Sequence, residues 1–198
     1  MKKVCTVCKV EKDYSEFSKR KKLLDGHRSQ CKFCDSVSGK KYFKTKEGLI
    51  ARIYGGQRER SKHRGYIMPN YSREELQEWI FAQTNFQTLW DNWVKSNYDK
   101  MLVPSCDRDN DYKPYTLDSI KLVTWQDNFD KGHSDRVNGI NNKHSKAVLQ
   151  YDLQGNFINE YHSQMQASRE TGVLNGDISA CCLGVQKTAG GFIWKFKV

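Results

Sequence analysis

Long apolar runs are missing from this sequence. Its first ten residues, MKKVCTVCKV, carry lysines but not the roughly 7 to 15 apolar residues of a secretory signal, and no later segment approaches the about 20 apolar residues of a membrane-spanning helix. We therefore expect an intracellular, cytoplasmic protein that does not contact a membrane. In such a reducing environment, its seven cysteines are expected to bind metal or to lie buried as thiols instead of forming disulfides.

Apolar residues are scarce throughout. Only 37% of the 198 residues are hydrophobic, which argues against a single large core, whereas 12% aromatic residues and five tryptophans argue against general disorder. The composition therefore favours small modules that are stabilised separately.

Acidic residues are fewer than basic residues in this sequence. Thirty-three Lys and Arg against 23 Asp and Glu give a formal net charge of +10. This excess favours a polyanionic partner, because each phosphate that a protein neutralises releases counterions. Net charge by itself does not distinguish DNA, RNA and a membrane surface.

Four cysteines form two C-x2-C pairs in a lysine-rich segment that is poor in aliphatic residues: Cys5 with Cys8, and Cys31 with Cys34. Each pair brings two thiolates to one ion, and two pairs complete the tetrahedral four-thiolate set of a structural zinc site. We predict a zinc finger, since this segment has too few apolar residues to fold without such a link. His27 is an alternative ligand, although the sequence DGHRSQ is more typical of an exposed basic residue.

The middle of the chain shows helical periodicity. Apolar and basic residues interleave in residues 40–66, which predicts an amphipathic helix with a basic face, broken at Gly55 and Gly56. Ser72 followed by Glu75 is a capping box that predicts the start of a second helix. Residues 84–98 predict a third helix, whose large apolar residues we expect in the core: Phe86, Leu89, Trp90 and Trp93.

The C-terminal segment combines strand and helix patterns. Two alternating strands flank a Gly-containing turn at residues 153–156, two short helices follow, and a last strand comes after a Gly-Gly turn. Two helices framed by strands predict a helix-turn-helix whose second helix enters a major groove, and a small α+β interaction module is the alternative. Cys181 and Cys182 are adjacent and cannot both face one ion from a helix, so we expect them to be buried or half-buried.

The central stretch PSCDRDNDYKPYTLDSIKLVTWQDN, residues 104–128, contains no histidine. It reads as a strand, a polar loop, a second strand and the start of a helix at about residue 123. Asp107 ends the first strand and Asn128 lies 21 residues later on the helix. If the helix folds back over the strand pair, the two side chains converge, which is the arrangement of a ββα-metal unit. One carboxylate and one amide suit Mg²⁺ with several waters retained better than zinc.

On these residues the chain resembles the HNH (His-Me finger) endonucleases, and in particular the phage-type free-standing and homing enzymes. The resemblance implies a metal ligand at Asp107 and another at Asn128, with Arg108 in place of the general-base histidine and Ser119 in place of a structural asparagine. The nine-residue spacing from Ser119 to Asn128 fits, and a phage variant with "DR" in the first strand is more similar still. The C-terminal segment, with QYDLQGNFINEY, ISACCLG and KTAGGFIWKF, looks like the intron-encoded nuclease repeat, a helix-turn-helix module.

Arginine cannot act as the base, because its guanidinium stays protonated. Two roles remain open for Arg108: contact with the scissile phosphate, where it would neutralise charge in the transition state, or a salt-bridging role without chemistry. Asp109 and Asp111 are supplementary metal ligands or, more in keeping with polar loops, residues that hold turns. Ser119 retains a hydroxyl that can make one of the loop hydrogen bonds of an asparagine.

The attacking water then needs another activator. His133 is the nearest histidine downstream, but it faces the metal only if the helix ends at Gly132. His63, Tyr112 and Tyr115 are further candidates. Activation by the metal or by solvent is the remaining possibility and implies a slow enzyme.

The sequence thus predicts an α+β chain of several modules. They are a zinc finger (1–44), a basic and aromatic helical segment (45–100), a ββα nuclease core (101–134), a linker (135–146) and a helix-turn-helix module (147–198). The resemblance implies a site-specific, homing-type endonuclease that cuts double-stranded DNA in a phage-infected bacterium, with structural Zn²⁺ and catalytic Mg²⁺. The alternatives are a non-catalytic DNA-binding protein on the same scaffold and an RNA-binding zinc-finger protein. A monomer is compatible with this organisation.

Overall fold

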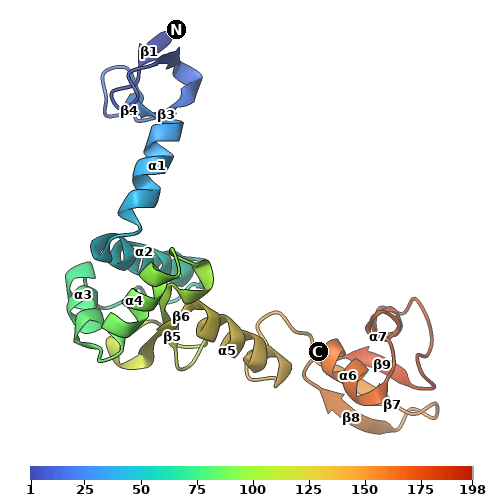
Figure 1. Cartoon of the computed structure of the whole chain (residues 1–198). Coiled ribbons are helices and arrows are strands. Elements are labelled where there is room, and N and C mark those ends of the chain that lie inside the picture. Colours follow the sequence, from blue (N-terminus) through green and yellow to red (C-terminus); the bar gives the residue numbers. More distant parts are fainter. Residues whose placement is uncertain (198) are drawn as a thin grey trace. The chain divides into compact units, whose positions relative to one another are not determined.

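The structure is a computed structural model that describes residues 1–197, and it is an α+β protein of short strands and helices (Figure 1). The chain divides into two compact units, Met1–Trp125 and Gln126–Val198. No helix in residues 1–197 is both long and apolar enough to cross a membrane.

The N-terminal segment contains two small antiparallel sheets. Strand β1 (Lys2–Val4) pairs with β2 (Glu11–Asp13), and β3 (Phe17–Lys19) pairs with β4 (His27–Cys31), with a 3-10 turn η1 (Tyr14–Glu16) between β2 and β3. Helix α1 (Lys32–Tyr42) follows β4 directly. The buried residues of this segment are Cys5, Phe17, Cys31 and Cys34. Because Phe17 is the one aromatic or aliphatic residue in that core, the cysteines have to supply most of the cohesion.

Helix α2 (Lys46–Arg64) runs without interruption through both central glycines, so the predicted break at Gly55 and Gly56 is wrong. The break lies instead between Tyr42 and Lys46, where α1 ends and the Thr45 side chain caps α2. Each helical glycine costs about 1 kcal/mol relative to alanine. Leu49 and Ile50 are fully buried on the same helix, and burying such side chains contributes about 1.5–3 kcal/mol each, which outweighs that cost.

The next two helices follow the sequence pattern. Helix α3 (Arg73–Ala82) begins at the predicted capping box, in which the Ser72 Oγ accepts a hydrogen bond from Glu75 N and the Glu75 carboxylate accepts one from Ser72 N. Helix α4 (Phe86–Lys95) buries Phe86 and Trp93. Leu89 and Trp90 pack against the same core, which confirms the core assignment of this aromatic stretch.

Strands β5 (Pro104–Arg108) and β6 (Ile120–Thr124) form an antiparallel pair. The 3-10 turns η2 (Lys100–Leu102) and η3 (Leu117–Ser119) precede the two strands. Helices α2, α3 and α4 gather beside this pair (Figure 1), and one hydrophobic core joins residues from all of these elements. That core includes residues on both sides of the predicted boundary at residue 100.

Helix α5 (Trp125–Val137) follows β6 without a loop. It begins later than predicted, because Val123 and Thr124 remain paired with β5. It continues through Gly132 and enters the predicted linker as far as Val137. Between Val137 and the next strand at Val148 the chain has turns but no regular element.

The C-terminal segment has the predicted hairpin, two helices and last strand. Strands β7 (Val148–Tyr151), β8 (Phe157–Tyr161) and β9 (Ile193–Phe196) form an antiparallel sheet in the order β8-β7-β9. Helices α6 (Gln164–Thr171) and α7 (Asn175–Cys182) are joined by residues 172–174. Cys181 is buried and Cys182 is half-buried, as predicted. Gly190 meets Val173 so closely that an added Cβ would lie 2.2 Å from Val173 Cγ2.

Candidate active site and metal centre

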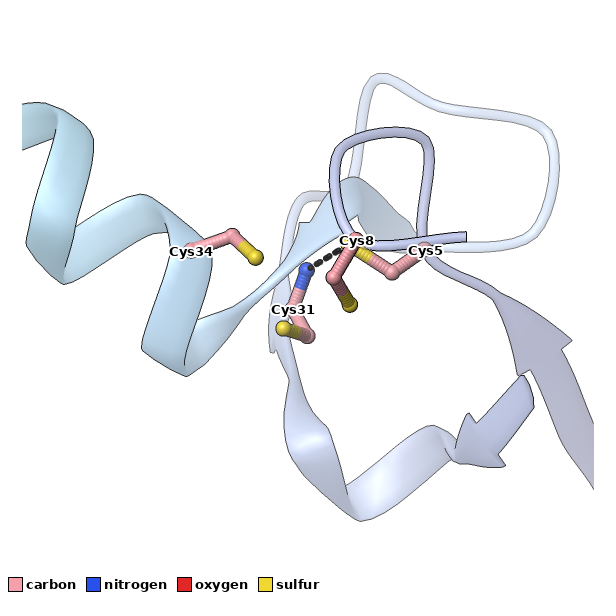
Figure 2. Close-up of side chains that lie close together, drawn as sticks. All are labelled: Cys5, Cys8, Cys31 and Cys34. Carbon is pink, nitrogen blue, oxygen red and sulfur yellow. Dashed lines mark hydrogen bonds between the residues drawn. The ribbon is translucent and has the colours of Figure 1, made fainter. Parts of the chain in front are cut away.

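Four sulfur atoms converge in the N-terminal segment. One ligand atom from each of Cys5, Cys8, Cys31 and Cys34 lies within 4.8 Å of the others. Figure 2 shows the first two cysteines on a tight loop, the third at the end of β4 and the fourth in the first turn of α1. The four thiols are free, so a four-cysteine group that can hold a metal such as zinc is present.

The surroundings of these sulfurs shift the pKa values of Cys5 and Cys34 in opposite directions. Burial alone raises the pKa of Cys5, but backbone N–H groups of Cys31, Cys8 and Val7 outweigh it and lower that pKa to about 6. One of these bonds, from Cys31 N to the Cys5 Sγ, is 3.3 Å long and is drawn in Figure 2. Burial and then the neighbouring Cys31, Cys8 and Cys5 raise the pKa of Cys34 to about 12. Several negative sulfurs cannot share this space without a cation, which is the situation that a bound metal resolves.

His27 has other partners. Its Nδ1 lies 2.9 Å from the backbone oxygen of Asp25, and its ring packs edge-on against Tyr14 with centroids 4.9 Å apart. It is not part of the four-cysteine group.

The two faces of the β5–β6 pair differ. Pro104, Cys106 and Arg108 are buried on one face of β5, whereas Ser105 and Asp107 are half-buried on the other. Asp107 lies directly opposite Lys121 of β6. The carboxylate of Asp107 therefore lies on a strand, on the more open face of the pair. In this position it could serve as an oxygen ligand for a hard cation.

Arg108 lies on the inner face. Its side chain is 3% exposed, its Nη1 donates to the backbone oxygen of Lys113 at 2.8 Å, and its Nη2 forms an ion pair with Asp111 at 3.0 Å. The guanidinium carbon also lies 4.4 Å from the centroid of the Tyr115 ring. These contacts hold the loop between the two strands, and they agree with the salt-bridging role that the sequence left open for Arg108.

Ser119 braces the same loop. Its Oγ accepts a hydrogen bond from Thr116 N at 3.0 Å and donates to Thr116 O at 3.1 Å. The backbone oxygen of Ser119 accepts from Asp109 N at 2.9 Å. The serine thus makes loop bonds of the kind expected from an asparagine at this position.

Three further candidates of the loop, Asp109, Asp111 and Tyr115, make side-chain contacts. Asp109 pairs with Lys121 of β6 at 2.7 Å, and Asp111 pairs with Arg108 at 3.0 Å. Tyr115 is 4% exposed and packs under the guanidinium, which removes it from contact with solvent. Tyr112 is 49% exposed on the loop surface.

Asn128 and His133 lie on α5, in the second compact unit, and Asp107 lies in the first. Asn128 is half-buried and His133 is exposed. Since α5 continues past Gly132 to Val137, the condition that would turn His133 toward the metal is not met. On this continuous helix, His133 lies about 140° around the axis from Asn128. His63, on α2, is exposed and pairs with Glu59 at 2.9 Å.

The first unit contains a basic pocket that no sequence pattern predicted. It has a volume of about 230 Å³ and lies between α2, η2 and β5. Its polar lining side chains are Arg52, Gln57, Arg60, Lys100 and Ser105. The basic residues of α2 predicted a charged face on this helix. The sequence pattern did not predict that this face lies close to Lys100 and Ser105.

Comparison with known proteins gives two partial similarities. A 60-residue stretch is 42% identical to an uncharacterized HNH endonuclease of Acanthamoeba polyphaga mimivirus, and it covers 30% of this chain and 18% of that protein. A 73-residue stretch is 34% identical to the probable mobile endonuclease B of Enterobacteria phage T4, and it covers 36% of this chain and 26% of that protein. No family model and no solved structure matches the chain. The chain thus spans only 18% and 26% of the length of these two relatives, and the similarity supports an HNH-type endonuclease.

Proposed function

We propose that this chain is a metal-dependent, site-specific DNA endonuclease of the HNH type, with a homing-type role. The observation that carries the proposal is the antiparallel β5–β6 pair followed directly by α5, with Asp107 on the open face of the pair. The partial relatives named as HNH and mobile endonucleases support it. The net charge of +10 supports a polyanionic substrate such as double-stranded DNA.

In this proposal Asp107 and Asn128 hold Mg²⁺. A half-buried carboxylate on a strand and an amide on a helix offer oxygen ligands, which Mg²⁺ prefers. The ion, when bound, supplies Lewis-acid stabilisation of the phosphate and a more acidic water. The chain itself contributes the rigid strand that positions Asp107 and the braced loop that holds the strand pair in register.

We assign Arg108 to the loop and not to the phosphate. At 3% exposure its guanidinium is committed to Asp111, to the backbone of Lys113 and to the Tyr115 ring. The chain then has no histidine base next to Asp107, and water activation falls to the metal and solvent. This predicts slow turnover.

The remaining modules provide binding. A zinc ion held by the four cysteines would fix the N-terminal finger, and exposed basic residues on α2 would contact the DNA backbone. Helices α6 and α7, joined by a three-residue turn, would act as the helix-turn-helix that supplies sequence preference.

A cleavage assay with the purified full chain tests the proposal. Mg²⁺ should allow nicking or cutting of phage or host genomic DNA, and end mapping should give a defined site. Asp107→Ala and Asn128→Ala should each abolish cleavage while DNA binding is retained. Asp109→Ala, which removes an exposed carboxylate two residues from Asp107, is the matched control and should still cut. Cleavage that survives both Asp107→Ala and Asn128→Ala would contradict the metal assignment.

A second function is favoured by one observation. Arg108 stands where HNH endonucleases carry a general-base histidine, and it is buried against Asp111 and the backbone of Lys113. The same scaffold would therefore suit a DNA-binding protein without catalysis. That function predicts tight, salt-dependent binding to duplex DNA and no cleavage with Mg²⁺ on any substrate.

A further inference from the structure

The basic pocket between α2, η2 and β5 concentrates positive charge without a counter-charge. Arg52, Arg60 and Lys100 line it, and none of its lining residues is acidic. Among the ion pairs formed within residues 1–197, none involves these three cations. Cations gathered in this way repel one another, and an anion relieves the repulsion.

Two of the three cations are oriented by aromatic rings. Lys100 Nζ lies 4.7 Å from the centroid of the Trp125 ring, and the Arg52 guanidinium carbon lies 5.8 Å from that of Trp93. Ring contacts of this kind hold a cation in place and leave its N–H donors available. The third cation, Arg60, lies one helical turn beyond Gly56 and is exposed.

A neutral donor is present as well. Gln57 lines the pocket and is 1% exposed, and its Nε2 has no hydrogen-bond partner. Its Oε1 accepts a hydrogen bond from the Tyr71 hydroxyl at 3.0 Å, and in this arrangement the N–H₂ end of the amide is the unpaired one. Burial raises the pKa of Tyr71 above its ordinary value, so the hydroxyl stays protonated and continues to donate. A buried amide N–H₂ without a partner is costly, and it is satisfied by an acceptor that enters the pocket.

The pocket also has a defined position on the strand that carries Asp107. Pro104, Ser105 and Cys106 of β5 line it, so both faces of the strand contribute, and Ser105 shares the half-buried face with Asp107. Residues i and i+2 of a strand are about 6.5–7 Å apart. An anion that contacts Ser105 would therefore lie one strand repeat from Asp107, which does not itself line the pocket.

We infer that this pocket binds one phosphate group of the DNA backbone next to the phosphate that is cut. The inference rests on the proposed function, because it takes the phosphate from the substrate of that function. Arg60 and Lys100 supply charge from two different elements, and Gln57 supplies a neutral N–H donor. Two cations and one buried neutral donor that line the same pocket distinguish it from the isolated lysines elsewhere on the chain.

Binding of the full chain to duplex DNA, measured by fluorescence anisotropy over a series of salt concentrations, tests the inference. Arg60→Gln should weaken binding about 5- to 10-fold and lower the slope of log K against log salt by about 0.9, the value for one lost phosphate contact. Lys100→Gln should act similarly. Because both cations hold the same phosphate, the double variant should lose less than the product of the two single losses. Arg64→Gln, an exposed arginine of α2 outside the pocket, is the charge-matched control and should combine multiplicatively with Arg60→Gln.

Gln57→Glu tests the neutral donor while keeping the acceptor that Tyr71 needs. It places a carboxylate oxygen against the phosphate and should weaken DNA binding at least tenfold. Because a carboxylate at this buried position also changes stability, urea unfolding of the variant is measured alongside, and binding is compared under conditions where the variant is folded. Thermal unfolding with inorganic phosphate, compared with chloride at equal ionic strength, identifies the source of the anion. Phosphate should stabilise wild type more than Arg60→Gln.

The outcomes separate the two proposals. Suppose that wild type cleaves DNA and that three variants bind DNA as tightly as wild type: Arg60→Gln, Lys100→Gln and Gln57→Glu. This result would overturn the phosphate-binding role of the pocket and leave the proposed endonuclease function intact. Stabilisation by inorganic phosphate or a deoxynucleoside monophosphate, lost in Arg60→Gln while DNA binding is unchanged, would assign the pocket to a free phosphate and overturn the backbone contact. Failure of wild type to bind duplex DNA would remove the proposed function itself.

Discussion

The guanidinium carbon of Arg108 lies 4.4 Å from the centre of the Tyr115 ring, and Nη2 of the same arginine is 3.0 Å from the Asp111 carboxylate. A cation between an aromatic face and a carboxylate is a structural element of the loop that joins β5 to β6. The residue next to Asp107 therefore supports the fold of this loop.

Arg108→Ala should destabilise the first unit strongly. Removing one partner of a buried ion pair leaves the other charge uncompensated and costs about 3–5 kcal/mol. Asp111 is partly exposed, so the lower end of that range is expected. Urea unfolding measures the loss. Asp109→Ala breaks the exposed pair with Lys121 and should cost about 1 kcal/mol or less. Equal losses in the two variants would show that the buried arginine does not hold the loop.

Local signals in the sequence predicted local structure well. The Ser72–Glu75 capping box and the aromatic spacing of α4 involve neighbours within one turn, so their outcome depends little on the rest of the chain. The four-cysteine group could be predicted equally well, because each C-x2-C pair restricts where its two sulfur atoms can lie.

Features that depend on distant residues could not be predicted in this way. The helix continues through Gly55 and Gly56 because Leu49 and Ile50 are buried by other elements, which no local propensity reports. The pocket brings Arg60 of α2 to Ser105 of β5, residues that only the fold makes neighbours. The roles proposed for Asp107 and Asn128 remain predictions that mutagenesis has to test.

Zinc binding to the four-cysteine group should release protons. The pKa of Cys34 is about 12 in the metal-free protein, so this thiol is protonated at pH 7.5 and must lose its proton to bind zinc. The pKa of Cys5, at about 6, lies below its ordinary value of 9.0, so this thiolate is already formed at pH 7.5. The Cys5 thiolate contributes to folding stability above pH 9, and this contribution is lost as the pH falls toward and through 6. Zinc affinity should therefore fall steeply below pH 6.

Calorimetry in two buffers of different ionisation enthalpy counts the released protons. At least one proton per zinc is expected at pH 7.5. Cys34→Ser should reduce the count, whereas Cys182→Ser, a half-buried cysteine of the C-terminal segment, should leave both count and affinity unchanged. Zinc uptake without proton release would contradict the assignment of Cys34 as a ligand.

Gly190→Ala should destabilise the C-terminal segment. The residue has a φ of 60°, and an added Cβ would lie 2.2 Å from the Val173 side chain, which is itself part of the core. Overpacking and backbone strain of this kind cost about 1–3 kcal/mol each. Gly176→Ala is the control, because no atom lies within 4 Å of its added Cβ and it sits in α7, where alanine gains up to about 1 kcal/mol. Thermal unfolding should show a loss for Gly190→Ala only.

Cleavage should show no histidine in its pH dependence. Helix α5 continues past Gly132, so His133 does not turn toward Asn128, and His63 is exposed and paired with Glu59. A histidine base would produce a plateau in the rate above about pH 6.5. With activation by metal and solvent, the logarithm of the single-turnover rate should instead rise steadily from pH 6 to pH 9. His133→Ala and His63→Ala should each stay within twofold of wild type over this range. A plateau that disappears in His133→Ala would identify that residue as the base and show that α5 unwinds at Gly132 when DNA binds.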